Sequence, residues 1–203
     1  MEILEYKIGD GAIAFSTKRG TPDGNYGSFN ITHYCGDAAE HVAACRKELC
    51  KQLEIPDERL ILPRQTHGSE IIHIDNVFLS KSKEEQEALL QGIDAIITAL
   101  PRTCIGVSTA DCVPILLHAP AQGVIAAVHA GWRGTVAGIT GKSVKAMLQG
   151  YNSHAEEIKA IIAPSISPEA FEVGEEVYTA FKTAGFPMAA RSWELSRRGY
   201  ACR

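Results

Sequence analysis

The sequence lacks a strong excess of charge of either sign. It has 20 Lys and Arg residues against 24 Asp and Glu residues, which gives a formal net charge of −4 and a pI near 6.0. Proteins that bind nucleic acid or anionic membranes usually carry a basic surface that complements phosphate groups. We therefore expect neither a nucleic acid nor a membrane among the partners of this chain.

Long hydrophobic runs are absent as well. No apolar segment approaches the ~20 residues that a membrane-spanning helix needs. The first residues, MEILEYKIGDG, show no basic stretch followed by an apolar one of the kind that signal peptides have. These two absences favour a cytoplasmic location.

The cysteines include no Cys-Xaa-Xaa-Cys pair, which argues against a zinc ribbon or a thioredoxin-type site. Six cysteines are present: Cys35, Cys45, Cys50, Cys104, Cys112 and Cys202. Disulfides are not expected, because no secretory signal accompanies them and a chain of this size does not need cross-links to fold. We expect Cys45 to be buried on a helix and Cys104 to lie in a strand core.

What the chain does contain is typical of one globular α/β domain. Hydrophobic residues make up 45% and charged residues 22% of its 203 residues, which is enough for one sizeable core. Strand-like and helix-like segments alternate without a repeat or a linker. This alternation predicts strands covered by helices in a single domain, residues 1–203.

Particular segments predict particular elements. A strand is expected near Ala12, a helix from an Asp37 cap to about Leu53, and an exposed helix in the charged residues 80–92. A further helix, packed on the sheet, is expected over residues 134–149. The middle of the chain is β-rich, with strand-length apolar runs at 59–62, 70–75, 94–98, 104–109, 113–119 and 123–130.

Three distant segments each place one soft-metal ligand among Gly or Asp residues. His67 lies in RQTHGSEI, Cys112 in GVSTADCVPILL and His129 in AAVHAGWRGTVAG. Two imidazoles and one thiolate suit zinc or copper. Structural zinc usually has four protein ligands, whereas three leave a position for water or substrate. The set therefore predicts a catalytic metal site.

The ends of two strands explain how the ligands would meet. Pro114 removes a ladder donor and indicates a sheet edge or a strand end beside Cys112. His129 holds the matching place at the end of its own run, before Gly131. Side chains at the ends of neighbouring strands converge, so we expect two ligands from adjacent strands and His67 from a turn.

The same segments carry a family resemblance. The motifs QTHG, TADCVPILL and HAGWRG, in this order, resemble the laccase-domain (YfiH) family, whose members are described as polyphenol oxidases and as zinc-dependent purine nucleoside phosphorylases. The stretches FSTKRG, SFNITHYCGD and APSISPEAFEVGEEV fit the pattern too. The resemblance spans about residues 15–186. The end SWELSRRGYACR departs from it, and we expect a member that is shortened at its C-terminus.

The resemblance implies a layered sandwich of mixed β-sheets flanked by helices. It also implies that His67, Cys112 and His129 bind the metal ion, one zinc with copper as the alternative.

Candidate substrate contacts lie around these ligands. Arg19 on a Gly-rich loop and Arg133 at a helix start are candidates for a phosphate clamp, because a helix N-terminus and an Arg fork both favour anions. Asn30 and His33 lie on a segment that fits the family. Asp111 is a candidate acid/base, provided that the chain bends so that it shares a pocket with Cys112. We expect His41 and His154 to be solvated, and His73 and His118 to lie on strand faces.

The first function hypothesis, which the resemblance implies, is a zinc-dependent purine nucleoside enzyme that phosphorolyses inosine, adenosine and methylthioadenosine and deaminates adenosine. The second is copper-dependent oxidation of phenols. A conventional laccase also has a trinuclear copper centre built from His-Xaa-His pairs, and the chain has no such pair.

Two further hypotheses use the same residues differently. Cys112 and His129 form the nucleophile and base of a Cys-His hydrolase in one, and a fourth ligand makes a structural metal site in the other. The expected partners are small molecules, purine nucleosides with phosphate or else phenols, and the expected state is a monomer or homodimer.

Overall fold

The computed structural model describes residues 1–188, 194–196 and 199–201. A central five-stranded sheet has the order β4-β5-β8-β7-β9, in which β4 and β5 are parallel and the other neighbours antiparallel. Its strands are β4 (Glu70–Ile74), β5 (Ile93–Thr98), β7 (Val113–Ala119), β8 (Val124–Ala130) and β9 (Lys159–Ile162). The sheet is therefore mixed, as expected.

Three smaller sheets accompany it. These are a hairpin of β1 (Ile3–Tyr6) and β2 (Ala14–Thr17), a parallel pair of β3 (Leu60–Ile61) and β6 (Cys104–Ile105), and an antiparallel set of β10 (Glu172–Val173), β12 (Gly199–Ala201) and β11 (Glu194–Ser196). The helices are α1 (Ala39–Leu53), α2 (Asn76–Leu79), α3 (Lys83–Leu89), α4 (Trp132–Val136), α5 (Ile139–Tyr151) and α6 (Glu175–Thr183). Short 3-10 turns occur at Asp57–Arg59, Pro120–Gln122 and Ala155–Glu157.

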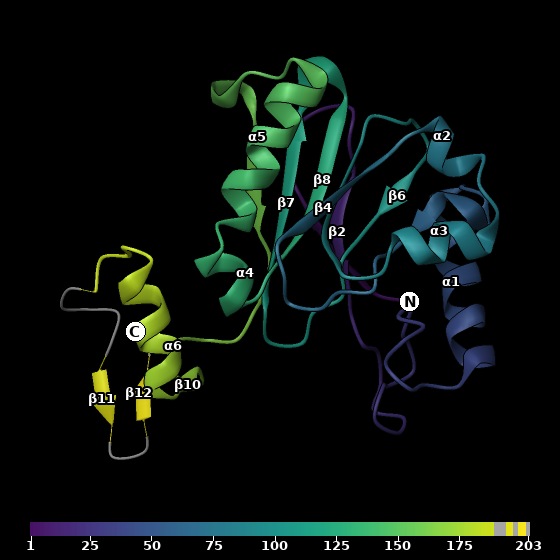
Figure 1. The fold of residues 1–203 in the computed structure, drawn as a ribbon. Helices are drawn as coiled ribbons and strands as arrows, with labels where there is room; N and C mark the ends of the chain where they lie inside the picture. Colours follow the sequence, from purple (N-terminus) through teal and green to yellow (C-terminus); the bar gives the residue numbers. More distant parts are fainter. Residues whose placement is uncertain (189–193, 197–198, 202–203) are drawn as a thin grey trace.

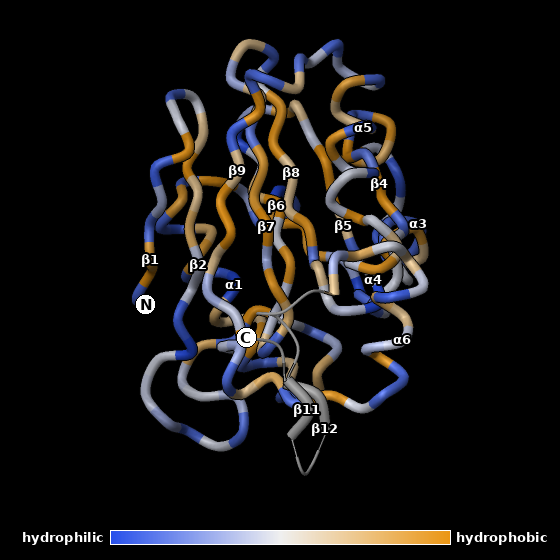
Figure 2. Tube along the Cα trace, turned by 90° about the vertical axis from the view of Figure 1, so that its left-hand side faces the viewer, coloured by the Kyte–Doolittle hydropathy of each residue, from blue (hydrophilic) through white to orange (hydrophobic). Residues whose placement is uncertain are grey.

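The central sheet is covered on both faces (Figure 1). Ala95 and Ile97 of β5 and Val128 of β8 pack under α5 together with its Ile139 and Met147. The opposite face, which includes Ile96 and Ala127, packs against Ile61, Ile105 and Phe78 from β3, β6 and α2. A third cluster joins α1 to β3. Figure 2 shows the hydrophobic stretches along β7 and β8 that these layers bury.

Two expected helices differ in detail. The helix expected from Asp37 to about Leu53 is α1, which begins at Ala39. Asp37 does not cap it, because the N-cap is Ala38, which makes no side-chain hydrogen bond. The helix expected over residues 134–149 is two helices, because Gly138 adopts φ +74° between α4 and α5. That left-handed conformation ends α4 and starts α5 in a new direction. The exposed helix is confirmed as α3, where Ser82 and Glu85 form a capping box.

Cys35, Cys45, Cys50, Cys104 and Cys112 are free thiols, and Cys202 lies outside the described residues. Of the helices in the described part of the chain, none has the length and apolar character that a membrane crossing requires.

Candidate metal centre and adjoining cavity

The ladder between β7 and β8 brings Cys112 and His129 to one place. Pro114 of β7 pairs with His129 of β8, and Val113 pairs with Ala130, so the next position along the ladder sets Cys112 opposite Gly131. Residues two apart in a strand share a face, which puts Cys112 on the face of Pro114 and His129. Pro114 lies at the start of β7, which agrees with the strand end that the sequence indicated as one of two possibilities, the other being a sheet edge.

His67 reaches the same place from a turn that precedes β4. Its backbone has φ +62°, a left-handed conformation that is uncommon for a residue with a side chain. The ring of His67 lies against the ring of His129, with centroids 4.9 Å apart and an interplanar angle of 76°. Two strand ends and one turn therefore supply the three side chains, as expected.

One nitrogen of each histidine and the sulfur of Cys112 all lie within 4.8 Å of one another. His129 is buried, Cys112 partly buried and His67 exposed, so the group opens to solvent on one side. Gly131 borders the hollow: a Cβ there would lie 3.0 Å from the Cys112 sulfur and 3.2 Å from Cδ2 of His67. The donor set and the space both fit one metal ion of the zinc or copper type.

Asp94 is the polar residue at this site that the sequence analysis missed. It is fully buried in β5, and its Oδ1 lies 2.7 Å from Nδ1 of His129. The same carboxylate accepts hydrogen bonds from the backbone N–H groups of Thr66, His67 and Gly68 at 3.2, 3.0 and 2.8 Å. Its one sequence signal is an acidic residue inside the buried strand IDAIIT.

Gln65 fixes the loop that leads to Cys112. Its side-chain amide donates to the carbonyl of Ser108 at 2.8 Å and accepts the N–H of Ser108 at 2.7 Å. The hydroxyl of Tyr34 donates to the same amide oxygen at 3.3 Å, and the hydroxyls of Thr32 and Ser108 are 2.5 Å apart. The QTHG turn is thereby tied to both neighbouring loops.

Burial is the main influence on the pKa values of Cys112 and His129. It raises the pKa of the Cys112 thiol, and the negative charges of Asp111 and Asp94 raise it further. Burial also lowers the pKa of His129, although its hydrogen bond to Asp94 acts in the opposite direction. Neutral imidazole is the form that binds metals.

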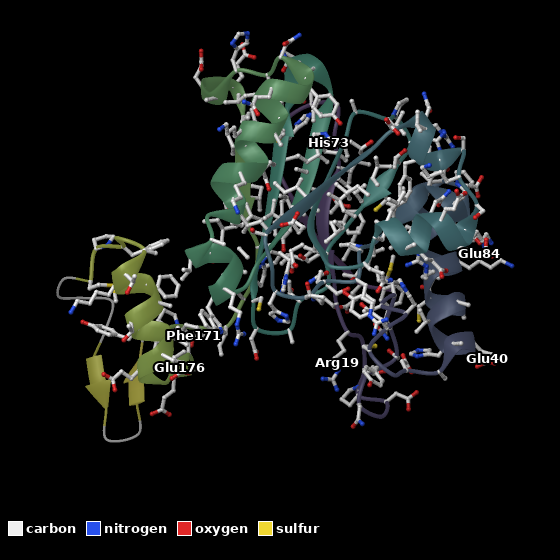
Figure 3. All side chains as sticks on the ribbon, in the orientation of Figure 1. Arg19, Glu40, His73, Glu84, Phe171 and Glu176 are labelled. Atoms are coloured by element: carbon white, nitrogen blue, oxygen red, sulfur yellow. The ribbon has the colours of Figure 1, made fainter. Side chains whose placement is uncertain are left out.

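A cavity of about 1320 Å³ adjoins the three candidate ligands, all of which line it. The polar side chains on its wall include Arg19, Asn30, Thr32, Tyr34, Gln65, Ser108 and Asp111, and apolar side chains line much of the remainder. Asp111 and Cys112 both line it because the chain bends over residues 110–112 before β7 starts. Arg19 is an exposed residue of the loop after β2 (Figure 3), and it lies beside Gly27.

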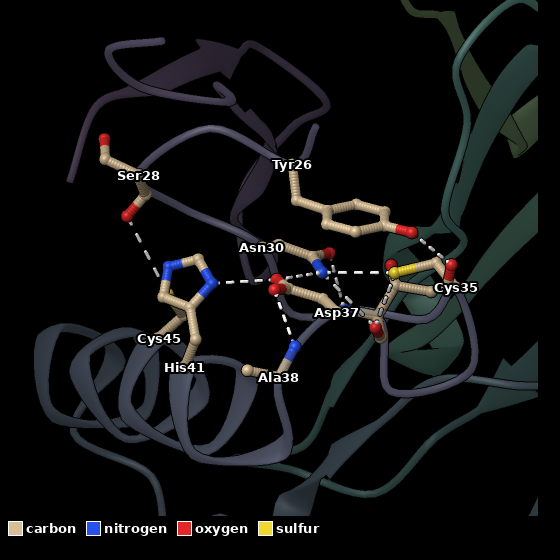
Figure 4. Close-up of polar contacts among 9 residues, drawn as sticks. Tyr26, Ser28, Asn30, Cys35, Asp37, Ala38, His41 and Cys45 are labelled. Carbon is tan, nitrogen blue, oxygen red and sulfur yellow. Dashed lines mark hydrogen bonds and ion pairs between the residues drawn. The ribbon is translucent and has the colours of Figure 1, made fainter. Parts of the chain in front are cut away.

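Asn30 belongs to a polar cluster on that wall (Figure 4). Its amide nitrogen donates to Asp37 at 2.9 Å and to the Cys35 sulfur at 3.2 Å. Asp37 also lies 2.8 Å from Nδ1 of His41. His41 is solvated in part, as its side chain is 32% exposed, but it also pairs with a carboxylate.

The structure leaves two of the expected substrate contacts outside the cavity wall. Arg133 stacks on Trp132, 4.2 Å from the ring centroid, and His33 packs edge-on against Tyr34. Neither is among the described residues that line the cavity. Burial, followed by the charge of Arg46, lowers the pKa of His33.

The remaining histidines lie where expected. His73 and His118 belong to β4 and β7. His73 is at the opposite end of the molecule from Arg19 (Figure 3), and His154 is exposed.

Known proteins resemble this chain in sequence and in fold. The chain is 45% identical over 169 residues to a purine nucleoside phosphorylase of Bacteroides thetaiotaomicron, a match that covers 83% of the chain and 63% of that protein. It is 43% identical to the adenosine deaminase RL5 of an unknown prokaryotic organism, over 92% of the chain and 72% of that protein. The crystal structure of YlmD from Geobacillus stearothermophilus superposes with a TM-score of 0.83 at 28% identity, over 95% of the chain and 73% of YlmD.

A family model described as multi-copper polyphenol oxidoreductase laccase matches residues 12–200, a longer stretch than the motifs marked. The match includes the QTHG, TADCVPILL and HAGWRG segments and with them all three candidate ligands. The chain therefore belongs to this laccase-domain family, which the order and content of those segments had indicated.

Proposed function

We propose that this chain acts as a metal-dependent purine nucleoside enzyme. In phosphorolysis an oxygen of inorganic phosphate bonds to C1′ of inosine, adenosine or methylthioadenosine, the C1′–N9 bond breaks, and the purine leaves with a proton. In deamination water replaces the 6-amino group of adenosine and ammonia leaves. We propose zinc as the ion and copper as its alternative.

The observation that carries the proposal is the group of His67, Cys112 and His129 at the wall of a cavity large enough for a nucleoside. Among the described residues no fourth His, Cys, Asp or Glu completes this group. A three-ligand set leaves a coordination position for a reactant, so the donor count favours catalysis over a structural site. An ion held there would supply a Lewis acid beside the substrate.

The cavity wall suggests roles for the chain's own groups. Arg19 would bind phosphate, because a guanidinium pairs with two phosphate oxygens, and Asn30 would hydrogen-bond the nucleoside. Asp111, exposed and beside Cys112, would move the proton that the leaving purine needs. We rank His33 and Arg133 below these residues as substrate contacts, because neither lines the cavity.

The names of two relatives support this reaction class, one being a purine nucleoside phosphorylase and the other an adenosine deaminase. The chain spans 63% of the first and 72% of the second. Because the chain spans only part of each relative, we propose, by similarity, that it has their activities. Small-molecule partners, a monomeric or homodimeric state and a cytoplasmic location remain predictions.

Two alternatives rest on specific observations. Copper-dependent phenol oxidation fits the description of the family model, and two His with one Cys also suit copper. A Cys-His hydrolase would use Cys112 with His129, which Asp94 orients as in a catalytic triad. The raised pKa of Cys112 argues against a reactive thiolate there.

The deciding experiment combines metal analysis with a phosphate-dependence test. Protein prepared in metal-free buffer is assayed for bound metals and then for hypoxanthine release from inosine, with and without inorganic phosphate. We expect release that needs phosphate and disappears in Cys112→Ser and His67→Asn. Asn tolerates the left-handed backbone of His67, and His154→Asn, at another exposed histidine, is the matched control that keeps activity.

Other outcomes would select an alternative. Phenol oxidation that follows added copper, without nucleoside turnover, would replace the proposal with the oxidase. Activity that survives chelators and is lost on thiol alkylation would replace it with the hydrolase.

A further inference from the structure

Asp94 is a buried carboxylate, and both of its oxygens have hydrogen-bond partners. Burying such a group is unfavourable unless each oxygen finds donors. Oδ1 receives the N–H of His67 and lies beside Nδ1 of His129, while Oδ2 receives the N–H groups of Thr66 and Gly68. Four donors from two separate segments therefore converge on one side chain of β5.

The strand register explains why Asp94 can reach His129. Ala95 of β5 pairs with Val128 of β8, so the next position along the ladder places Asp94 beside His129. Ala95 and Ile97 face α5, and the alternation of strand faces directs Asp94 to the other side of the sheet, where the metal ligands lie. The contact is therefore built into the central sheet.

One side of the carboxylate fixes the turn that carries His67. Three consecutive backbone N–H groups, from Thr66 to Gly68, point at Asp94. His67 holds φ +62° within this turn, a conformation that persists only where surrounding contacts determine it. The three hydrogen bonds supply that determination.

The other contact fixes the ring of His129. A carboxylate 2.7 Å from Nδ1 can only accept a hydrogen bond, and a neutral ring that donates from Nδ1 keeps the lone pair of Nε2 for a metal ion. Hydrogen bonds of this kind set both the tautomer and the orientation of metal-binding histidines.

We propose that Asp94 is the positioning residue of the metal centre, because one carboxylate fixes both the turn that carries His67 and the ring of His129. The inference rests on the metal site of the proposed function, but not on the identity of the substrate. Cys112 does not depend on Asp94 in this way, because the loop before it is held by Gln65 through Ser108.

Asp94→Asn tests the proposal. An amide has one acceptor oxygen and one NH₂ group, so it cannot accept from all four donors. If the NH₂ faces His129, it requires the tautomer that carries a proton on Nε2, and the metal-binding lone pair is lost. The matched control is Thr98→Val, which removes both side-chain hydrogen bonds from another fully buried polar residue of β5.

The readout is cobalt binding, followed by the thiolate-to-cobalt band in the near ultraviolet and the ligand-field bands in the visible. We expect Asp94→Asn to bind cobalt about 10- to 100-fold more weakly, with a changed ligand-field spectrum. Thr98→Val should lose thermal stability and keep the wild-type affinity and spectrum. A folded Asp94→Asn with wild-type affinity and spectrum would overturn the proposal.

A second measurement needs no variant and covers the case in which Asp94→Asn does not fold. Long-range ¹H–¹⁵N spectra of the metal-free wild-type protein report the tautomer of His129. We expect the proton on Nδ1, and a proton on Nε2 would overturn the proposal. If cobalt binds as expected but no nucleoside is turned over, the proposed function fails while the role of Asp94 stands.

Discussion

At the scale of single residues, the ligand group depends on a missing side chain as much as on the three that are present. Gly131 lies opposite Cys112, and a Cβ there would meet the Cys112 sulfur, Cδ2 of His67 and Cε1 of His129 at 3.0, 3.2 and 3.8 Å. Its φ of −68° suits any residue, so these close contacts, and not the backbone conformation, account for a glycine. The GWRG turn had drawn attention to Arg133, whereas its first glycine forms part of the site.

Gly131→Ala should disturb this centre. We expect a loss of stability of about 1–3 kcal/mol from overpacking, together with weaker cobalt binding, because the added methyl occupies space between the ligands. The control is Gly141→Ala on the exposed face of α5, where nothing lies within 4 Å. That variant should gain up to ~1 kcal/mol from helix propensity. Equal cobalt affinity in both variants would contradict the prediction.

The pair of His41 and Asp37 predicts a dependence of stability on pH. Asn30 first, and then His41, lower the pKa of Asp37 from 3.8, and Asp37 raises the pKa of His41 from 6.5. The carboxylate contributes stability above pH 3.8 and loses it as the pH falls through its lowered pKa. The imidazolium contributes below pH 6.5 and loses it as the pH rises through its raised pKa.

Both contributions are therefore present between pH 3.8 and 6.5. We expect His41→Gln to lower the melting temperature more at about pH 5.5 than at about pH 8.5. Thermal melts of the variant and the wild type at the two pH values measure this. A difference that is the same at both would show that the pair does not respond to the charge of His41.

At the scale of elements, the two faces of the central sheet differ sharply from its edge. Ile97 of β5 is fully buried, whereas Ile162 of β9 is 73% exposed at the edge of the same sheet. We expect Ile97→Ala to cost about 2–5 kcal/mol, from lost burial and the cavity left behind. Ile162→Ala, the same change at the edge, should stay within about 0.5 kcal/mol of the wild type. Denaturant unfolding measures both, and similar losses would contradict this packing.

The elements that could be predicted from sequence are those with a strong local signal. The apolar runs of β5, β7 and β8 have strand length, and Ser82 with Glu85 marks the start of α3. The break at Gly138 was missed because apolar residues continue at helical spacing across it. The expected Asp37 cap was wrong, because that carboxylate accepts hydrogen bonds from Asn30 and pairs with His41 instead.

The residues of the candidate site also divide into those that the sequence could predict and those that it could not. The three candidate ligands stand out because soft-metal donors in short Gly- and Asp-flanked motifs are distinctive. Asp94 does not stand out, because its position beside His129 results from the pairing of β5 with β8, and strand order is a long-range property. Arg133 looked like a cavity residue in the sequence, but its contact with Trp132 depends on the short helix α4.

At the scale of the whole molecule, the ligand geometry is maintained by the protein itself. The central sheet, Asp94 and Gln65 hold all three ligand segments through hydrogen bonds that involve no metal. A zinc-finger-like site, by contrast, folds only around its ion. The ion should therefore add stability by mass action alone, without being needed for the fold.

Metal removal tests this directly. After treatment with a chelator we expect enzymatic activity to disappear, while far-ultraviolet circular dichroism and a cooperative thermal transition persist. The melting temperature should fall by an amount set by the affinity for the ion, and it should return on addition of zinc. Unfolding on chelation would instead identify a structural metal site.

The pairing of His129 with Pro114 has a further consequence for how the protein assembles. A slip of one residue between β7 and β8 would turn the imidazole of His129 to the opposite face of the sheet, away from Cys112. A chain with misregistered strands would lack a complete set of donors, so an ion at this site would favour the correct register. During refolding, the thiolate-to-cobalt band should appear only after β8 has paired with both β5 and β7. The appearance of the band would therefore report the last stage of sheet formation.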